Sequence, residues 1–196
     1  MGTPPLSFRA RLRLAARRLR MGRAAALARD EGGATAVEFA LLMIPFLLLF
    51  FGLIELGLIF FAGVTLENAV IDTSREIRTG QVQVASGTAS SFKSAVCTRM
   101  TWLEGPCASA LRVDVRTVST FASASSLKTP TTTCWDPGGP ASLVVVRAYY
   151  AWPVITPLLQ SALSTNSQGK RTLTAATAFV NEPYNSTTAS SVTCPS

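Results

Sequence analysis

The sequence predicts an α+β protein: a single N-terminal transmembrane helix extends into a small exported domain with an antiparallel sheet, stabilised by disulfides. Three observations predict this fold class. A long apolar run near the N-terminus is almost uncharged, three later segments have strand-like patterns, and all four cysteines follow the apolar run. A chain of 196 residues has room for one domain besides the membrane segment.

The apolar run covers residues 39–61. Residues 39–54 carry no charge, and Glu55 is the one ionisable side chain in the run. At about 1.5 Å per residue, a helix of this length crosses the roughly 30 Å of hydrocarbon in a bilayer. A secretory signal peptide has a shorter apolar core, of about 7 to 15 residues. The run therefore predicts a membrane-spanning helix.

Basic residues gather before this run. Residues 1–29 hold eight arginines and no acid, whereas the rest of the chain holds ten basic and eleven acidic residues. By the positive-inside rule the N-terminal side stays in the cytoplasm, and the chain after about Gly63 is exported. This pattern indicates membrane orientation, so we expect no nucleic-acid partner. The leader is either a loose basic helix on an anionic membrane surface or a solvated segment.

The exported part begins with residues 65–78, whose apolar positions indicate that the helix continues and becomes amphipathic. Three later segments are predicted as strands: residues 111–121, 142–152 and 171–180. The first alternates apolar with charged residues, which predicts a strand that is wet on one face. Pro153 ends the second, and the third has a weaker pattern because alanine is a poor strand former. We expect the tryptophans, Trp102, Trp135 and Trp152, in the core or over disulfides.

The cysteines are Cys97, Cys107, Cys134 and Cys194, an even number on the exported side. They form no Cys-x-x-Cys pair, and the chain has no histidine, so disulfides in an oxidising compartment fit better than a metal site. Three pairings are possible. We favour Cys97 with Cys107, which closes a short loop, and Cys134 with Cys194.

Enzyme chemistry finds little support. The absence of histidine removes the commonest metal ligand and the usual general base near neutral pH. A membrane-tethered hydrolase is a further hypothesis, but the sequence has no Gly-x-Ser-x-Gly motif. We therefore expect no catalytic residue, no cofactor and no metal.

The most informative segment lies between the leader and the apolar run. Gly33 stands at this junction, and Glu38 follows five residues later at the edge of the run. A charged side chain at the centre of a membrane helix costs about 2.5 to 3.5 kcal/mol, and less near the interface. Glu38 is therefore expected to find a positive partner. The alternative is that residues 32–33 form a flexible hinge and the Glu38 carboxylate lies in water.

Together these features resemble the TadE-like pseudopilins of tight-adherence (Flp-type) pilus systems and, more broadly, the type IV pilins. The resemblance covers about residues 29–65 and rests on the basic leader and on Gly33, Glu38, Phe39, Pro45, Glu55, Leu56 and Gly57. It implies a structural or initiating minor subunit, cut by a prepilin peptidase after Gly33, so that Ala34 becomes the new N-terminus. Gly32 offers an adjacent competing cut.

The resemblance also implies a division of the chain and a set of partners. Residues 1–33 would be the cytoplasmic leader, residues 34–63 the pilin-like transmembrane helix and residues 64–196 the exported domain. The partners would be other pilin-like subunits through the hydrophobic helix, the prepilin peptidase and the inner-membrane pilus assembly platform. The protein would be a single-pass inner-membrane protein with a periplasmic C-terminal domain, and its incorporation into a pilus stays open.

Within an assembly, three residues are expected to set the register of the helix: Glu38, Phe39 and Glu55. The Glu38 carboxylate of one subunit would pair with the Ala34 ammonium of its neighbour. Glu55 lies about 100° around the helix from Glu38 and would either meet a different helix or lie shallow near the exported surface. The alternative function is an uncleaved bitopic scaffold of the same or another secretion apparatus.

Overall fold

The computed structural model describes residues 31–130, 132–156, 159–166, 168–185 and 192–194. The chain divides into two compact units, one up to Phe51 and the other Gly52–Ser196. The helices are α2 (Glu31–Arg78), α3 (Gln81–Val84), α4 (Ala89–Arg99), the 3₁₀ helix η1 (Thr101–Leu103), α5 (Glu104–Ala110), α6 (Phe121–Ser125) and α7 (Gln160–Leu163). The strands are β1 (Leu111–Thr117), β2 (Cys134–Trp135), β3 (Leu143–Pro153) and β4 (Lys170–Val180). The expected basic helix within residues 1–29 lies outside the described residues.

The long helix α2 changes character along its length. In the second unit one stripe of the helix is buried, at positions three or four residues apart: Gly52, Glu55, Ile59, Ala62, Leu66, Ala69, Val70, Thr73 and Ile77. A stripe of this spacing faces one side of an α-helix. The predicted amphipathic continuation over residues 65–78 is therefore confirmed.

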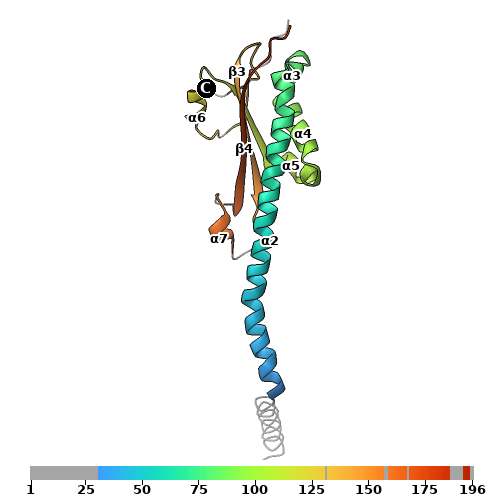
Figure 1. The fold of residues 1–196 in the computed structure, drawn as a ribbon, viewed down its shortest axis with the longest axis vertical. Helices are drawn as coiled ribbons and strands as arrows, with labels where there is room; N and C mark the ends of the chain where they lie inside the picture. Colours follow the sequence, from blue (N-terminus) through green and yellow to red (C-terminus); the bar gives the residue numbers. More distant parts are fainter. Residues whose placement is uncertain (1–30, 131, 157–158, 167, 186–191, 195–196) are drawn as a thin grey trace, which may run out of the picture. The chain divides into compact units, whose positions relative to one another are not determined.

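The sheet has four strands in the order β2-β1-β3-β4. β3 is its centre and pairs antiparallel with β1 and with β4, whereas β2 is short and pairs parallel with β1. In Figure 1, α4 and α5 lie beside the α2 segment of this unit, and α6 lies on the other side of the sheet. The α+β class, with one long apolar helix and a mostly antiparallel sheet, is confirmed.

The core lies between the sheet and the helices α2 and α4. Alternate residues of the strands point into it, as the period of two in a strand requires: Leu111, Val113, Val115, Val144, Val146, Ala148, Tyr150, Leu173 and Ala175. From α4, Phe92 and Val96 meet them, and Phe92 packs on Trp135 with ring centroids 5.6 Å apart. Burial at the centre of this core raises the pKa of Tyr150 above its ordinary value, because the phenolate would be poorly solvated.

The strand boundaries differ from the expected ones mainly at the end of β1. That strand was expected to reach residue 121 but ends at Thr117, because Thr120 starts a new helix. The Thr120 side chain accepts a hydrogen bond from the Ser123 backbone, and the Ser123 hydroxyl accepts one from the Thr120 backbone. This reciprocal capping fixes the N-terminus of α6. The other two predicted strands agree with β3 and β4 within one residue.

The polar face of β1 is only partly wet, whereas the prediction was a wet face: Arg112 and Arg116 are half-buried. Asp114 is completely buried and accepts hydrogen bonds from Arg116 Nε at 2.8 Å and Arg147 Nε at 2.9 Å. Arg147 also donates to the backbone carbonyls of Leu127 and Lys128, at 3.1 and 3.0 Å. The segment after α6 thus binds Arg147 on this face, and Asp114, Arg116 and Arg147 form an ionic cluster around a buried aspartate.

Two disulfides close the domain, in the pairing that the sequence favoured. Cys97 in α4 is bonded to Cys107 in α5, and Cys134 in β2 is bonded to Cys194 near the C-terminus. Beside the second bond, the Trp135 and Thr193 backbones exchange hydrogen bonds of 3.2 and 2.9 Å. The C-terminal segment is therefore fixed to the edge strand β2.

The expectation for the tryptophans is right for two of the three. Trp135, next to Cys134, is 1% exposed and Trp152 is 5% exposed. Trp102 is 44% exposed, although its ring stacks on Phe61 with centroids 5.5 Å apart. Trp102 is therefore a surface residue beside α2.

Candidate functional site: the carboxylates and apolar surface of α2

The predicted processing segment lies in the first turns of α2. Gly33 is inside the helix, which begins at Glu31 in the described residues, and not at a junction before it. It is exposed, and a Cβ added there would meet no atom within 4 Å. Glycine lowers helix stability by about 1 kcal/mol relative to alanine. This part of α2 therefore unwinds more readily than an alanine-rich helix would.

The surface of α2 up to Phe51 is apolar on all sides. Leu42 is 71% exposed, Phe39 63% and Phe46 59%, and many neighbouring apolar side chains are also exposed. Within the described residues, α2 is the one helix long and apolar enough to cross a membrane. Exposed apolar surface of this extent is not stable in water, so the helix anchors the domain in a membrane or against other apolar helices.

Glu38 interrupts this apolar surface near its N-terminal end. Its side chain is exposed, and the described part of the chain holds no salt-bridge partner for it. Phe39 beside it is exposed as well. The structure thus brings Gly33, Glu38 and Phe39 together on the first two turns of one helix, with the charge unpaired within the described chain.

Glu55 differs from Glu38, because other residues of the same chain donate hydrogen bonds to its carboxylate. Its side chain is only 3% exposed. Its two oxygens accept hydrogen bonds from the backbone N–H groups of Ile155 at 2.6 Å and Thr156 at 2.9 Å. The two expectations for Glu55, a contact with a different helix or a shallow place near the exported surface, stay predictions. Within the chain, the carboxylate holds the segment that follows β3 against α2.

This contact explains why a charged residue stands in an apolar helix. Glu55 belongs to the buried stripe of α2, and Ile59 and Ala62 are the next buried residues along it. Leu159 approaches the same surface, since a Cβ added to Gly52 would lie 3.2 Å from its Cδ1. No sequence pattern predicted this contact, because Glu55 and Ile155 are 100 residues apart in the sequence.

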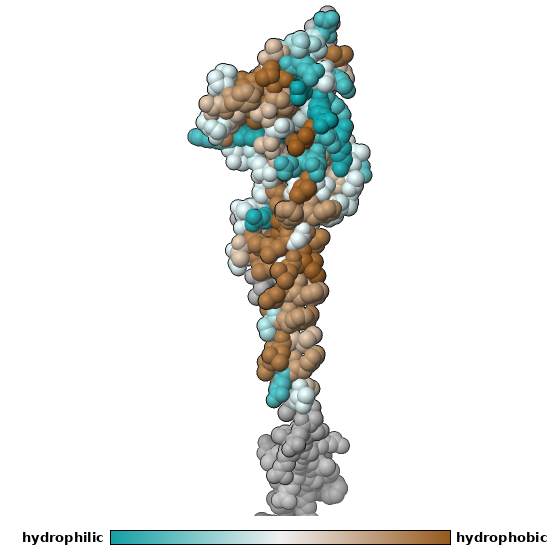
Figure 2. Space-filling view, in the orientation of Figure 1, coloured by the Kyte–Doolittle hydropathy of each residue, from teal (hydrophilic) through white to brown (hydrophobic). Residues whose placement is uncertain are grey.

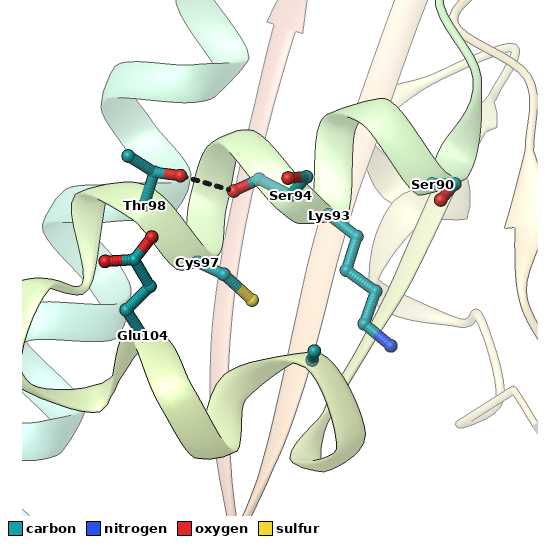
Figure 3. Close-up of a pocket in the computed structure, with 7 residues that line it drawn as sticks. Ser90, Lys93, Ser94, Cys97, Thr98 and Glu104 are labelled. Atoms are coloured by element: carbon teal, nitrogen blue, oxygen red, sulfur yellow. Dashed lines mark hydrogen bonds between the residues drawn. The ribbon is translucent and has the colours of Figure 1, made fainter.

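A surface hollow of about 410 Å³ lies between α4 and α5, over the Cys97–Cys107 disulfide. In Figure 3, Lys93 and Glu104 come from different helices and lie apart from each other, and the Thr98 hydroxyl bonds the Ser94 carbonyl. The other lining residues are Ser90, Ser94, Cys97 and Ala108. The lining side chains offer no nucleophile paired with a base, since the cysteine is in a disulfide.

Metal-binding geometry is likewise lacking in the described part of the chain. No three histidine, cysteine, aspartate or glutamate side chains gather in a way that could hold an ion. The buried acid of the sheet, Asp114, is occupied by Arg116 and Arg147. The features that remain as a candidate site are therefore the start of α2 and its apolar surface.

Comparison with known proteins finds a match that also lies in α2. Residues 33–75 match the family model described as TadE-like protein. The match begins at Gly33 and ends near the end of α2, so it covers the helix and not the sheet. No curated protein and no solved structure matches the chain. Over residues 33–75, the resemblance to the TadE-like family that the sequence indicated is therefore confirmed.

Proposed function

We propose that this protein is a TadE-like pseudopilin, a structural or initiating minor subunit in the assembly of a tight-adherence pilus, processed by a prepilin peptidase. The family match over residues 33–75 carries the proposal. TadE-like proteins are structural pilus components and not an enzyme family, which agrees with the absence of histidine from the chain. The exposed apolar surface of α2 supports a role in a membrane and in contacts between helices.

In this proposal the chain has three functional parts. Residues 1–33 are the cytoplasmic leader, residues 34–63 the pilin-like helix in the inner membrane, and residues 64–196 the periplasmic domain. Cleavage after Gly33 leaves the ammonium group of Ala34 at the start of the helix. In an assembly, the Glu38 carboxylate of one subunit pairs with the Ala34 ammonium of the next, and Phe39 packs beside the pair. Other pilin-like subunits, the peptidase and the assembly platform are the partners.

Processing is tested with the full chain and an active prepilin peptidase expressed together. We expect the chain to shorten by its first 33 residues, and Gly33→Ala to abolish this cut, because the cleft has no room for a side chain before the scissile bond and alanine strengthens the helix. Intact-mass measurement and N-terminal sequencing give the cut site, and a start at Gly33 identifies Gly32 as the residue before the cut.

Gly57→Ala is the matched control for this variant. Gly57 is also an exposed glycine of α2, and a Cβ there meets no atom within 4 Å. The control should be cut like the unchanged chain. If active peptidase leaves the unchanged chain at full length in native membranes, the processing step is refuted.

Assembly is tested at Glu38. We expect Glu38→Gln to reduce the recovery of the processed chain with other pilin-like subunits by at least about tenfold, because breaking a buried charge pair costs roughly 2 kcal/mol or more. Co-purification from cross-linked membranes measures it. Glu67→Gln removes an exposed acid further along the same helix and should have no effect. Normal recovery of Glu38→Gln would remove the proposed role of this carboxylate.

The second candidate function is an uncleaved bitopic scaffold in the envelope. It is favoured by one observation, which is that residues 32–33 already belong to a helix. A peptide bond in a helix must unwind before a protease can cut it. In this case the mass of the native protein would include the arginine-rich leader, and Gly33→Ala would change nothing.

A further inference from the structure

The base of the second unit carries exposed apolar side chains from three separate segments. From α2 they are Leu53, Leu56, Phe60 and Phe61, from η1 Trp102, and from the segment after β3 Ile155; all are between 44% and 74% exposed. Trp102 stacks on Phe61, and the backbone of Ile155 is bonded to Glu55. The three segments thus meet around one stretch of α2, and Figure 2 shows hydrophobic residues covering the visible face of that stretch. We call these six residues the apolar collar.

Four backbone groups around Ile155 have hydrogen-bond partners within the protein. Glu55 accepts the N–H groups of Ile155 and Thr156, Gln160 donates to the Val154 carbonyl at 3.2 Å, and the Leu159 N–H donates to the Thr156 carbonyl at 3.0 Å. A surface loop in water normally leaves such groups to the solvent. Irregular backbone that enters lipid needs partners inside the protein, because hydrocarbon offers none. Ile155 itself points outward and is 65% exposed.

The polarity of α2 changes just beyond the collar. Between residues 52 and 66, Glu55 is the one ionisable residue, and it is buried. The next exposed positions include Glu67, Asp72 and Arg75. Trp102 lies at this boundary beside Phe61, and tryptophan is the side chain that concentrates at the interface between membrane and water.

The length of the helix agrees with this boundary. A helix from residue 34 to residue 61 rises by about 42 Å at 1.5 Å per residue. The hydrocarbon core of a bilayer is about 30 Å thick, and the bilayer with its interfacial regions about 40 to 45 Å. A helix of this length is therefore long enough for residues near Phe61 to reach the outer interfacial region.

We propose that the apolar collar is a lipid-binding surface, with Ile155 and Trp102 immersed in the leaflet on the exported side. Glu55 is the internal acceptor that allows the loop backbone to enter that leaflet. The proposal rests on the membrane anchoring proposed above. It adds that the domain itself contacts lipid and that the helix is not its sole attachment.

The depth of Ile155 tests the proposal in the full chain. Ile155→Cys is labelled with an environment-sensitive fluorophore, which is selective because no free cysteine occurs among the described residues. The protein is placed in phosphatidylcholine and phosphatidylglycerol vesicles that carry nitroxides on the acyl chains. We expect at least twofold quenching by these lipids and little quenching by aqueous iodide. Phe121→Cys in α6, 61% exposed in the native chain, is the control and should show the reverse.

Glu55→Leu in the same labelled chain tests the role of the carboxylate. Leucine cannot accept the hydrogen bonds that the N–H groups of Ile155 and Thr156 donate to Glu55. The label at residue 155 should therefore move toward water and lose most of its quenching by the lipid nitroxides. The disulfides and the Phe121 label report whether the domain is still folded. Unchanged quenching in a folded Glu55→Leu chain would contradict the proposed role of Glu55.

Vesicle flotation separates the possible failures. A chain that floats with vesicles while its Ile155 label is quenched by iodide like the control is anchored by the helix alone, and the collar proposal is then wrong. A label protected in native membranes but open to iodide in pure lipid vesicles identifies a protein occupant, and this also overturns the proposal. A chain that does not float refutes the membrane anchoring itself.

Discussion

Asp114→Ala is expected to lower the free energy of unfolding by about 3 to 5 kcal/mol, the usual cost of breaking a buried ion pair from one side. The aspartate side chain has no exposed surface, and that of Arg147 is 10% exposed. Alanine would leave the guanidinium of Arg147 in the same buried place without its counter-charge. The hydrogen bonds of Arg147 to the Leu127 and Lys128 carbonyls would then hold a charge that nothing balances.

The measurement is denaturant unfolding of the full chain in detergent, followed by near-ultraviolet circular dichroism. Glu182→Ala is the matched control, because it also removes one acid from an arginine pair, Arg78–Glu182 at 3.3 Å, but both side chains are about half exposed. Exposed pairs contribute about 0 to 1 kcal/mol. If Asp114→Ala costs no more than this control, the cluster does not stabilise the sheet.

Removing the Cys134–Cys194 disulfide is expected to cost about 4 kcal/mol, against about 3 kcal/mol for Cys97–Cys107. The two bonds close sequence separations of 60 and 10 residues, and a longer loop loses more chain entropy when it is closed in the unfolded state. The larger loss should also release the C-terminal segment, because its hydrogen bonds with Trp135 are few.

The two double variants, Cys134→Ala with Cys194→Ala and Cys97→Ala with Cys107→Ala, control for each other. Each removes two sulfurs and one bond, so their difference isolates the effect of loop length. Unfolding in detergent gives the two free energies, and limited proteolysis reports release of the C-terminal segment. A greater loss for the short loop would show that native packing, and not chain entropy, sets the contribution of these bonds.

Local patterns were enough to predict α2 and three of the strands, although β1 ends at Thr117 and not at residue 121. The uncharged run and the apolar positions Leu66, Ala69, Val70 and Ile77 predicted a helix that leaves the membrane and packs by one face. The apolar β3 at the centre of the sheet was predicted from its apolar run, and the segments that form β1 and β4 were also predicted, β4 from a weaker pattern. The short β2 was missed because a strand of two residues carries no periodic signal. The helices α4 and α5 were missed because short segments rich in serine and alanine carry little of it.

The start of the candidate site was also visible in sequence. Gly33, Glu38 and Phe39 fall within seven residues of the sequence, so their spacing alone places them within about two turns of one helix. Their expected roles in cleavage and assembly remain proposals. The structure adds the local state of Gly33, which lies within a helix.

By itself, the sequence determined which segment is apolar enough to span a membrane and where apolar residues follow a helical or a strand period. It also determined that the cysteines lie on one side of the membrane segment. These are properties of neighbours along the chain. Only the tertiary structure decided which charged side chains are buried and paired. Asp114 is paired because Arg147 of β3 reaches it and is itself held by the carbonyls of residues 127–128, and Glu55 is paired because the backbone of residues 155–156 reaches it. Whether a charged group is solvated or paired depends on segments far away in sequence, and no local pattern encodes that contact.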